Sequence, residues 1–202
     1  MNDLNLEYIN FHLSKDKRLA SIIANINLPI LQGDGDVYAA LIRSIVSQQL
    51  STKAAATIYN RFLDLFENRY PDKDTVRTYS IEDLRAVGLS RQKANYIKNV
   101  VDFFHENEKE TSDWNVMSDE AIIDYLTQIK GVGKWTVEMM LMFTLHRLDV
   151  LPLDDLAIRN RMIQLYEVKA TGKQLKPELT RIAESWRPYR SVACRYLWQS
   201  IG

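Results

Sequence analysis

Residues 129–136 read I-K-G-V-G-K-W-T, in which two glycines lie one residue apart and are followed by a lysine. Glycine lets a ligand approach the backbone closely because it has no side chain. A helix that begins after Gly133 presents N–H groups without intrahelical partners and the positive end of the helix dipole. Lys134 adds a full positive charge. With Gly131, this pattern is typical of a phosphate cradle; the alternative is a plain turn between helices, for which one glycine would suffice.

Helix-forming segments flank this turn and dominate the rest of the chain. Apolar residues recur at helical spacing over 37–50, 91–104 and 134–146. The polar stretch 105–115 is typical of a surface connection between two helical halves. Alternating strand patterns are absent, so the sequence predicts an all-α fold.

Serine residues mark several of the predicted helix starts. Ser80 is followed three residues later by Asp83, which resembles a capping box. Ser90 and Ser118 precede further helical segments and are predicted to be N-caps. Gly88 lies where the helix that follows Ser80 would end.

The composition narrows the class of protein. The 202 residues include 26 basic and 26 acidic side chains, so net charge alone does not indicate a nucleic-acid binder, although a local basic face is still compatible with it. The single cysteine, Cys194, excludes an internal disulfide and a cysteine-ligated metal site, and we expect it to be a small buried residue. No signal peptide and no apolar run of roughly 20 residues are visible. We therefore expect an intracellular protein that does not enter a membrane.

Several motifs together resemble one known family. The segment L-T-Q-I-K-G-V-G-K-W-T resembles the helix-hairpin-helix of the DNA glycosylase superfamily, and V-L-P-L-D-D-L-A-I-R resembles the loop that carries its essential aspartate. The segments S-I-V-S-Q-Q-L-S, V-G-L-S-R-Q-K-A-N-Y-I and W-R-P-Y-R-S-V-A-C-R-Y-L-W are also similar to that family and occur in its order. The similarity is greatest to the 3-methyladenine DNA glycosylase II branch. It implies a compact bilobal helical bundle with a cleft between its lobes.

The resemblance assigns the essential aspartate to Asp155, the second carboxylate of L-D-D-L. A glycosidic bond breaks through a state with oxocarbenium character, and a nearby carboxylate stabilises its positive charge. Without the resemblance, Asp154 or Asp155 would be read as a helix N-cap. Asp155 can do both jobs, whereas Asp154 is expected to be a cap or loop residue.

Position 135 separates branches of the superfamily. Members that also cut the DNA backbone carry a lysine there, which forms a Schiff base with the sugar. This chain has Trp135 instead, so the resemblance implies a monofunctional enzyme that uses water as the nucleophile. The iron–sulfur branch requires four cysteines, and one cysteine excludes it.

Three side chains are expected to line the pocket for the damaged base. An alkylated purine carries positive charge, which an aromatic face such as that of Trp135 attracts. Trp198 matches another aromatic near the site of similar enzymes, and Met139 lies one turn after Trp135, where the best-known enzyme of this branch carries a tyrosine. The alternative for both tryptophans is an ordinary place in the core.

The resemblance also places S-Q-Q-L-S, residues 47–51, at the minor groove. Gln49 is expected to fill the space that the flipped base vacates, with Gln48 beside it in the groove; a polar turn is the alternative. Lys93, Arg159 and Arg161 are either phosphate contacts or solvated surface residues.

These expectations describe a DNA glycosylase that flips out and excises alkylated bases, chiefly 3-methyladenine and also 7-methylguanine. Two alternatives stay open: the same fold acting on uracil, hypoxanthine or mismatches, and a helix-hairpin-helix module that only binds DNA. We expect one domain over 1–202 with two helical lobes and no separate N-terminal domain, acting as a monomer on double-stranded DNA. No cofactor and no catalytic metal are expected, although the hairpin of this superfamily can hold a monovalent ion through its carbonyls.

Overall fold

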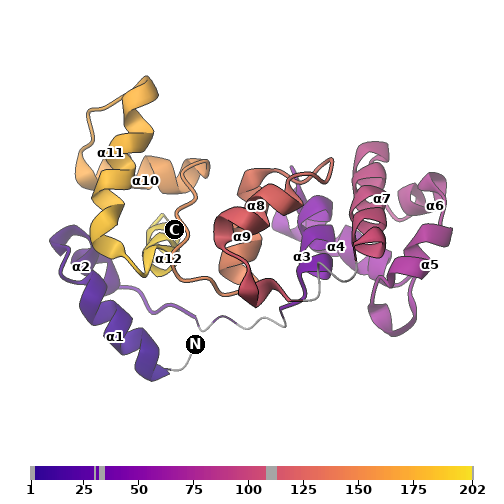
Figure 1. Ribbon diagram of the computed structural model, residues 1–202, viewed down its shortest axis with the longest axis horizontal. Coiled ribbons are helices and arrows are strands. Elements are labelled where there is room, and N and C mark those ends of the chain that lie inside the picture. The colour runs from indigo at the N-terminus through magenta and orange to yellow at the C-terminus, as the bar shows by residue number, and fades with distance from the viewer. Residues whose placement is uncertain (1–2, 30, 32–34, 108–112, 202) are drawn as a thin grey trace. The chain divides into compact units, whose positions relative to one another are not determined.

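The computed structural model describes residues 3–29, 31, 35–107 and 113–201 (Figure 1). The residues in these ranges form helices, turns and irregular segments without a strand, so the predicted all-α class is confirmed. The chain divides into two compact units, and the division falls inside helix α9. Unit 2 comprises residues 34–140, and unit 1 comprises residues 1–33 and 141–202. The predicted cleft between lobes and the single domain stay predictions.

Unit 2 carries the hairpin and the polar loop predicted at the minor groove. Its α-helices are α3 (Val37–Ser47), α4 (Thr52–Leu63), α5 (Lys73–Thr78), α6 (Ile81–Ala86), α7 (Arg91–Glu106), α8 (Asp119–Leu126) and the start of α9 (Lys134–Phe143). The 3₁₀ turns η1 (Glu67–Arg69) and η2 (Trp114–Val116) lie between them.

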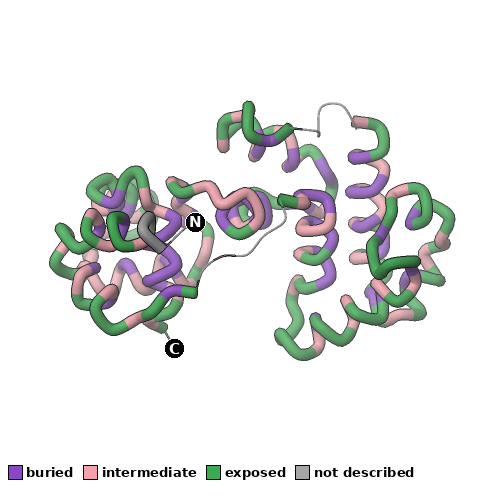
Figure 2. Tube along the Cα trace, turned by 90° about the horizontal axis from the view of Figure 1, so that it is seen from below, coloured by how far each residue is buried: buried purple, intermediate pink, exposed green. Residues whose placement is uncertain are grey.

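Helix α7 packs against α3, α5 and α6, and its buried stripe explains why. The side chains of Ala94, Ile97, Val101 and Phe104 are buried, as their helical spacing predicted. Figure 2 shows helices striped in purple and green, because each buries one face and exposes the other. The core of unit 2 is therefore built from one-sided helices.

The predicted helix starts in unit 2 are confirmed. Ser80 and Asp83 form a reciprocal capping box at α6. Ser90 accepts from the Lys93 amide at the start of α7, and Ser118 accepts from the Ala121 amide at the start of α8. These side chains accept hydrogen bonds from N–H groups that have no partner inside the helix.

Unit 1 brings the two ends of the chain together. Its helices are α1 (Asp3–Leu13), α2 (Lys17–Ile23), the end of α9, α10 (Leu156–Tyr166), α11 (Leu175–Ala183) and α12 (Arg190–Gln199), with the 3₁₀ turns η3 (Gly172–Gln174) and η4 (Glu184–Trp186). In Figure 1 the indigo helices α1 and α2 lie beside the orange and yellow helices, and α12 packs against α2 and α10.

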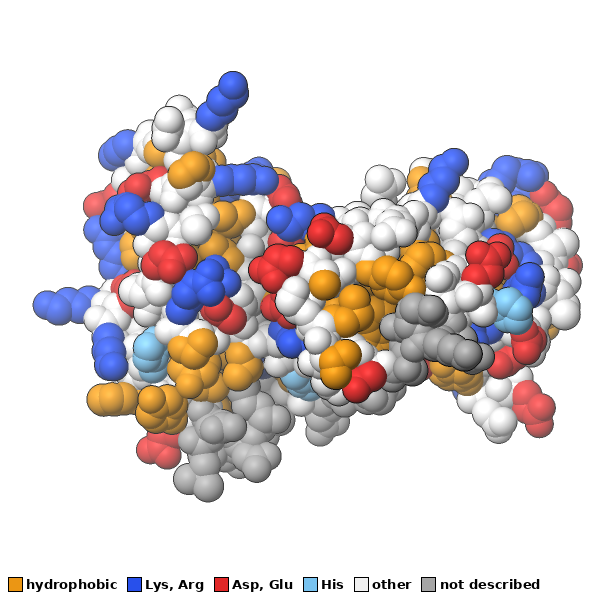
Figure 3. Space-filling model, viewed as in Figure 1, with side chains coloured by type: hydrophobic (Ala, Val, Ile, Leu, Met, Phe, Trp, Pro, Cys, Tyr) orange, Lys and Arg blue, Asp and Glu red, His pale blue; other side chains and the backbone are white. Residues whose placement is uncertain are grey.

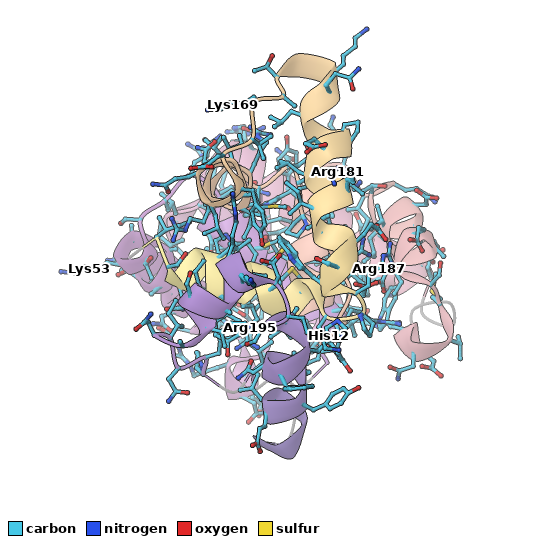
Figure 4. All side chains as sticks on the ribbon, turned by 90° about the vertical axis from the view of Figure 1, so that its left-hand side faces the viewer. His12, Lys53, Lys169, Arg181, Arg187 and Arg195 are labelled. Carbon is cyan, nitrogen blue, oxygen red and sulfur yellow. The ribbon has the colours of Figure 1, made fainter. Side chains whose placement is uncertain are left out.

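Helix α12 is the centre of unit 1. Every residue from Ser191 to Leu197 is buried, including Cys194, which is fully buried as expected. Arg195 is buried as well and donates a hydrogen bond to the carbonyl of Pro29, and burial lowers the pKa of its guanidinium (Figure 4). A helix buried on all sides fixes the residues at its C-terminal end, where Trp198 lies.

Two predicted helices end earlier than their apolar patterns suggest. Residues 134–146 are helical only to Phe143, because His146 has a φ of 55° and the Arg147 amide turns back to the Leu141 carbonyl. Residues 37–50 are helical only to Ser47, since Gln49 has a φ of 57°. A left-handed residue cannot continue an α-helix.

Candidate nucleic-acid interface and active site

The helix-hairpin-helix consists of α8, a turn over residues 127–133, and α9. Gly131 lies at the tight point of this turn with a φ of 106°, which side-chain-bearing residues rarely adopt. A Cβ at this position would lie 2.3 Å from Cγ of Tyr96 on α7. Glycine at 131 is therefore required by the backbone conformation and by the ring that covers it.

Gly133 is a different case. A Cβ added to Gly133 would meet no atom within 4 Å, and its φ lies outside the left-handed range. Its carbonyl accepts from the Val137 amide at 3.2 Å, so Gly133 immediately precedes α9 and is exposed. Among the residues that the structure describes, none is close enough to a Cβ at this position to require glycine here. The missing side chain lets a ligand approach the backbone at the start of α9 closely, which agrees with the phosphate cradle that the sequence predicts.

Lys134, the first residue of α9, has an exposed side chain. Its ammonium lies 3.7 Å from Oε1 of Glu138, one turn along the helix, whose side chain is only 5% exposed. The cation at the hairpin therefore also neutralises a buried carboxylate.

Residues 47–51, which we call the wedge loop, connect α3 to α4. Gln49 is exposed and left-handed, and Gln48 ends α3. The Gln48 side-chain amide lies 3.5 Å from the Gly131 carbonyl, so the wedge loop and the hairpin meet. A left-handed residue other than glycine costs of order 1–3 kcal/mol and persists only where its surroundings hold it.

Lys93 holds this loop from α7. Its ammonium donates to the carbonyls of Val46 at 2.8 Å and Gln48 at 2.6 Å, and burial lowers its pKa. Its charge is used at the C-terminal end of α3, which the sequence alone did not indicate.

Asp155 is both a helix cap and a partner of tryptophan. Its Oδ1 accepts from the Ile158 amide at 2.8 Å and from Nε1 of Trp198 at 3.2 Å, so the N-cap reading is confirmed. The ring of Trp198 lies 5.7 Å from that of Phe143, which is 37% exposed. Two donors from different helices therefore fix the orientation of one carboxylate. The neighbouring Asp154 is ion-paired with Lys176 at 2.5 Å.

Trp135 and Met139 lie one turn apart on α9. Trp135 is 42% exposed, so the alternative of an ordinary core residue is wrong for it. Met139 is half-buried, and its neighbours Met140 and Met142 are buried in the core. The two side chains share one stripe of the helix because residues four apart face the same way.

A family model described as the HhH-GPD superfamily of base excision DNA repair proteins matches residues 42–188, well over half of the chain. The chain belongs to the HhH-GPD superfamily. The match contains the wedge loop, the hairpin and Asp155. The matched residues end before Trp198. The position of Trp198 beside Asp155 is therefore given by the structure and not by the family match.

Individual proteins show the same similarity. The DNA-3-methyladenine glycosylase 1 of Schizosaccharomyces pombe is 36% identical over 186 residues, which are 91% of this chain and 81% of that protein. The solved structure of a 3-methyladenine DNA glycosylase of this yeast with abasic DNA has a TM-score of 0.78 and 34% identity, over 96% of each chain. A DNA-3-methyladenine glycosidase structure from Bacillus halodurans has a TM-score of 0.81 and 34% identity, over 95% of this chain and 87% of that one.

Some basic side chains of this HhH-GPD chain make contacts within the protein that the sequence did not predict. Arg161 donates to Ser200 at 2.7 Å and Arg159 lies 3.5 Å from the Leu153 carbonyl, so both also bond within unit 1. Lys53 in the first turn of α4, two residues after the wedge loop, is exposed and extends away from the ribbon (Figure 4). Its position just after the S-Q-Q-L-S segment is the sequence feature that could have identified Lys53 as an exposed cation near the wedge loop. On the face drawn in Figure 3, basic and acidic side chains are interspersed.

None of the described helices is long and apolar enough to cross a membrane. Within residues 3–29, 31, 35–107 and 113–201, no three His, Cys, Asp or Glu side chains come together in a way that can hold a metal ion.

The two hairpin glycines are expected to differ in how strongly alanine destabilises the protein. Gly131→Ala should lower the free energy of unfolding by about 3 kcal/mol or more, because it combines a strained backbone with overpacking against Tyr96. Gly133→Ala should lower it by only about 1 kcal/mol or less, since its position is strain-free but alanine is a poorer N-cap residue than glycine. Urea unfolding of both variants provides the measurement. Equal destabilisation by the two substitutions would contradict this division of roles.

Proposed function

We propose that this protein is a monofunctional DNA glycosylase that flips out alkylated bases, chiefly 3-methyladenine and also 7-methylguanine, and excises them by hydrolysis of the glycosidic bond. The observation that carries the proposal is the Asp155 carboxylate, fixed at the start of α10 by the Ile158 amide and by Trp198, in a chain of the HhH-GPD superfamily. The similarity to named 3-methyladenine glycosylases supports the substrate class. The proposed setting is intracellular, with one monomer of both units acting on double-stranded DNA.

In the proposed reaction, the bond between C1′ and the base nitrogen breaks and its electron pair stays with the base. The base leaves neutral because alkylation had made it cationic, so it requires little acid catalysis. The carboxylate of Asp155 stabilises the positive charge that develops on the sugar. Water then adds to C1′ and gives its proton to the Asp155 carboxylate. The products are a free base and an unbroken strand with an abasic site.

The pocket proposed for the base uses Trp135, Met139 and Trp198. An exposed aromatic face offers a cationic purine about 0.5–2 kcal/mol of attraction, and the 42% exposure of Trp135 supports that role. Methionine contributes an adaptable apolar surface. Trp198 is proposed to touch the base while its indole N–H holds Asp155.

The proposed DNA contacts follow from the two loops of unit 2. The amides behind Gly133 and the ammonium of Lys134 bind a phosphate, which gives affinity without sequence preference. The wedge loop enters the minor groove, where Gln49 occupies the vacated stack and Gln48 lies beside it. The monovalent ion at the hairpin stays a prediction. The Lys130 and Gly131 carbonyls are near side-chain amides of Asn99 and Gln48, and each oxygen has a second lone pair for an ion.

Removal of the hairpin cation should weaken binding to every duplex, damaged or undamaged. Lys134→Ala is expected to reduce the slope of log affinity against log salt by about 1, because one phosphate contact is lost. Fluorescence anisotropy at several salt concentrations measures this slope. Lys169→Ala, which removes an exposed lysine from the loop before α11, is the control for net charge (Figure 4). An unchanged slope in Lys134→Ala would remove that side chain from the interface.

The replacement of the family's lysine by Trp135 predicts the reaction type. Incubation of the protein with methylated duplex and borohydride should trap no covalent adduct, because no amine is available at this position. The strand should break only after alkali treatment. A trapped adduct or earlier strand cleavage would show that the enzyme is bifunctional.

The Asp155→Asn variant tests the enzyme assignment itself. Asparagine keeps an oxygen that can accept from Ile158 and Trp198 and caps helices about as well as aspartate, so near-native melting and DNA binding are expected. Loss of the charge should slow single-turnover release of 3-methyladenine by on the order of a hundredfold or more, equivalent to about 3–4 kcal/mol.

Asp154→Asn is the matched control for this variant. It removes the neighbouring carboxylate and its exposed ion pair with Lys176, which contributes about 1 kcal/mol or less. Its excision rate should stay close to that of the parent. If Asp155→Asn excises bases at the parental rate, the non-enzymatic DNA-binding module becomes the better assignment.

A further inference from the structure

Helix α7 presents three side chains, each three residues after the last, to the loops proposed to bind DNA. Lys93 bonds the carbonyls of Val46 and Gln48 at the wedge loop. The Tyr96 ring covers Gly131, and the Asn99 amide donates to the Lys130 carbonyl at 2.9 Å. Residues three apart are neighbours on a helix surface. We call Lys93, Tyr96 and Asn99 the α7 ridge.

The α7 ridge lies on a long helix that is packed into the core of unit 2. Helix α7 is 16 residues long, and its apolar stripe is fully or nearly fully buried. The ridge contacts begin in the first turn, where Ser90 caps the helix, and continue over two turns. The loop residues that bond to side chains of this helix are therefore held in a fixed position relative to it.

The chemistry of the contacts suits a positioning role. The last carbonyls of a helix have no partners inside it, and the half-buried ammonium of Lys93 bonds one of them, Val46, together with the carbonyl of the C-cap residue Gln48. Hydrogen bonds from a charged donor are stronger than neutral ones. The residue after Gln48 is Gln49, whose backbone is left-handed. Such a conformation persists only where the neighbouring residues are held in place.

The wedge loop and the hairpin also touch directly, through the Gln48 amide and the Gly131 carbonyl at 3.5 Å. This contact is long, whereas the Lys93 and Asn99 bonds are between 2.6 and 2.9 Å. The shorter bonds all come from α7. The spacing of the two loops is therefore set mainly by the helix that both of them contact.

We propose that the α7 ridge fixes the register between the wedge loop and the hairpin, and that Lys93 is the positioning residue for Gln49. The inference rests on the proposed function, since it concerns how that site handles DNA. The proposal distinguishes phosphate binding from base flipping. The hairpin binds phosphate without Lys93, whereas the stable flipped state requires the wedge loop that Lys93 positions.

Helix α7 itself offers a matched control. Lys98 lies on the same helix, and its ammonium donates to the carbonyls of Val76 and Arg77 at the end of α5, at 2.9 and 3.0 Å. Burial lowers the pKa of this ammonium too. Lys98→Met therefore removes the same kind of contact from the same helix without touching either loop.

The experiment compares Lys93→Met, Lys98→Met and the parent protein. Each binds an undamaged duplex and a duplex with a tetrahydrofuran abasic analogue, with 2-aminopurine beside the analogue to report unstacking. Lys93→Met should bind the undamaged duplex as the parent does, but lose about tenfold or more of its preference for the abasic duplex. The 2-aminopurine signal should fall in parallel. Lys98→Met should keep both parental values.

Amide hydrogen exchange without DNA gives a second measurement. Lys93→Met should speed exchange at residues 47–51, and Lys98→Met should speed it at residues 76–79 instead. Melting curves identify the temperatures at which both variants are folded, and all measurements are made there. A general loss of stability would then speed exchange throughout the protein and not at one of these segments alone.

The outcomes distinguish this inference from the proposed function. If the parent prefers the abasic duplex and Lys93→Met keeps that preference, the positioning role of Lys93 is overturned and the glycosylase assignment stands. A parent protein that shows neither a preference for the abasic duplex nor base excision would overturn both. Parallel losses in Lys93→Met and Lys98→Met would show that Lys93 only stabilises the fold.

Discussion

Most of the candidate site residues lie at or beside helix ends. Each helix end leaves backbone donors or acceptors without partners in the helix, and these groups must be bonded by something else. The protein treats three such ends differently. The carboxylate of Asp155 caps the start of α10, and the ammonium of Lys93 bonds the carbonyls of Val46 and Gln48 at the end of α3. Gly133, which precedes α9, has no side chain to accept from the amides that follow it. Charged side chains bond two of these ends, and we propose that the third binds a phosphate.

The proposed binding through backbone amides would explain how a chain of zero net charge can belong to a DNA repair superfamily. On the face drawn in Figure 3, acidic and basic side chains alternate, so this face is not uniformly positive. A helix N-terminus concentrates about half a positive charge at one point. A phosphate at such a point needs only a few donors in fixed positions. In the proposed binding mode, the position of the hairpin therefore matters more than the total charge.

The Asp155 carboxylate has a structural role as a helix cap beside the catalytic role that we propose for it. Its Oδ1 receives a backbone amide from its own helix and an indole N–H from α12. The first bond is local and could be expected from the L-D-D-L sequence. The second joins residues 43 positions apart and depends on the packing of unit 1. Together they hold the carboxylate in one orientation, which electrostatic stabilisation of a developing cation requires.

The sequence by itself determined the helical class, the serine caps, the hairpin and the motifs that identify the family, because these depend on local spacing and residue type. Tertiary structure decided the rest. It ended α3 and α9 through left-handed residues, made Gly131 necessary through the ring of Tyr96, and exposed Trp135. It also turned Lys93 from a surface cation into a partner of the wedge loop. Such contacts join residues far apart in the chain, so no local pattern encodes them.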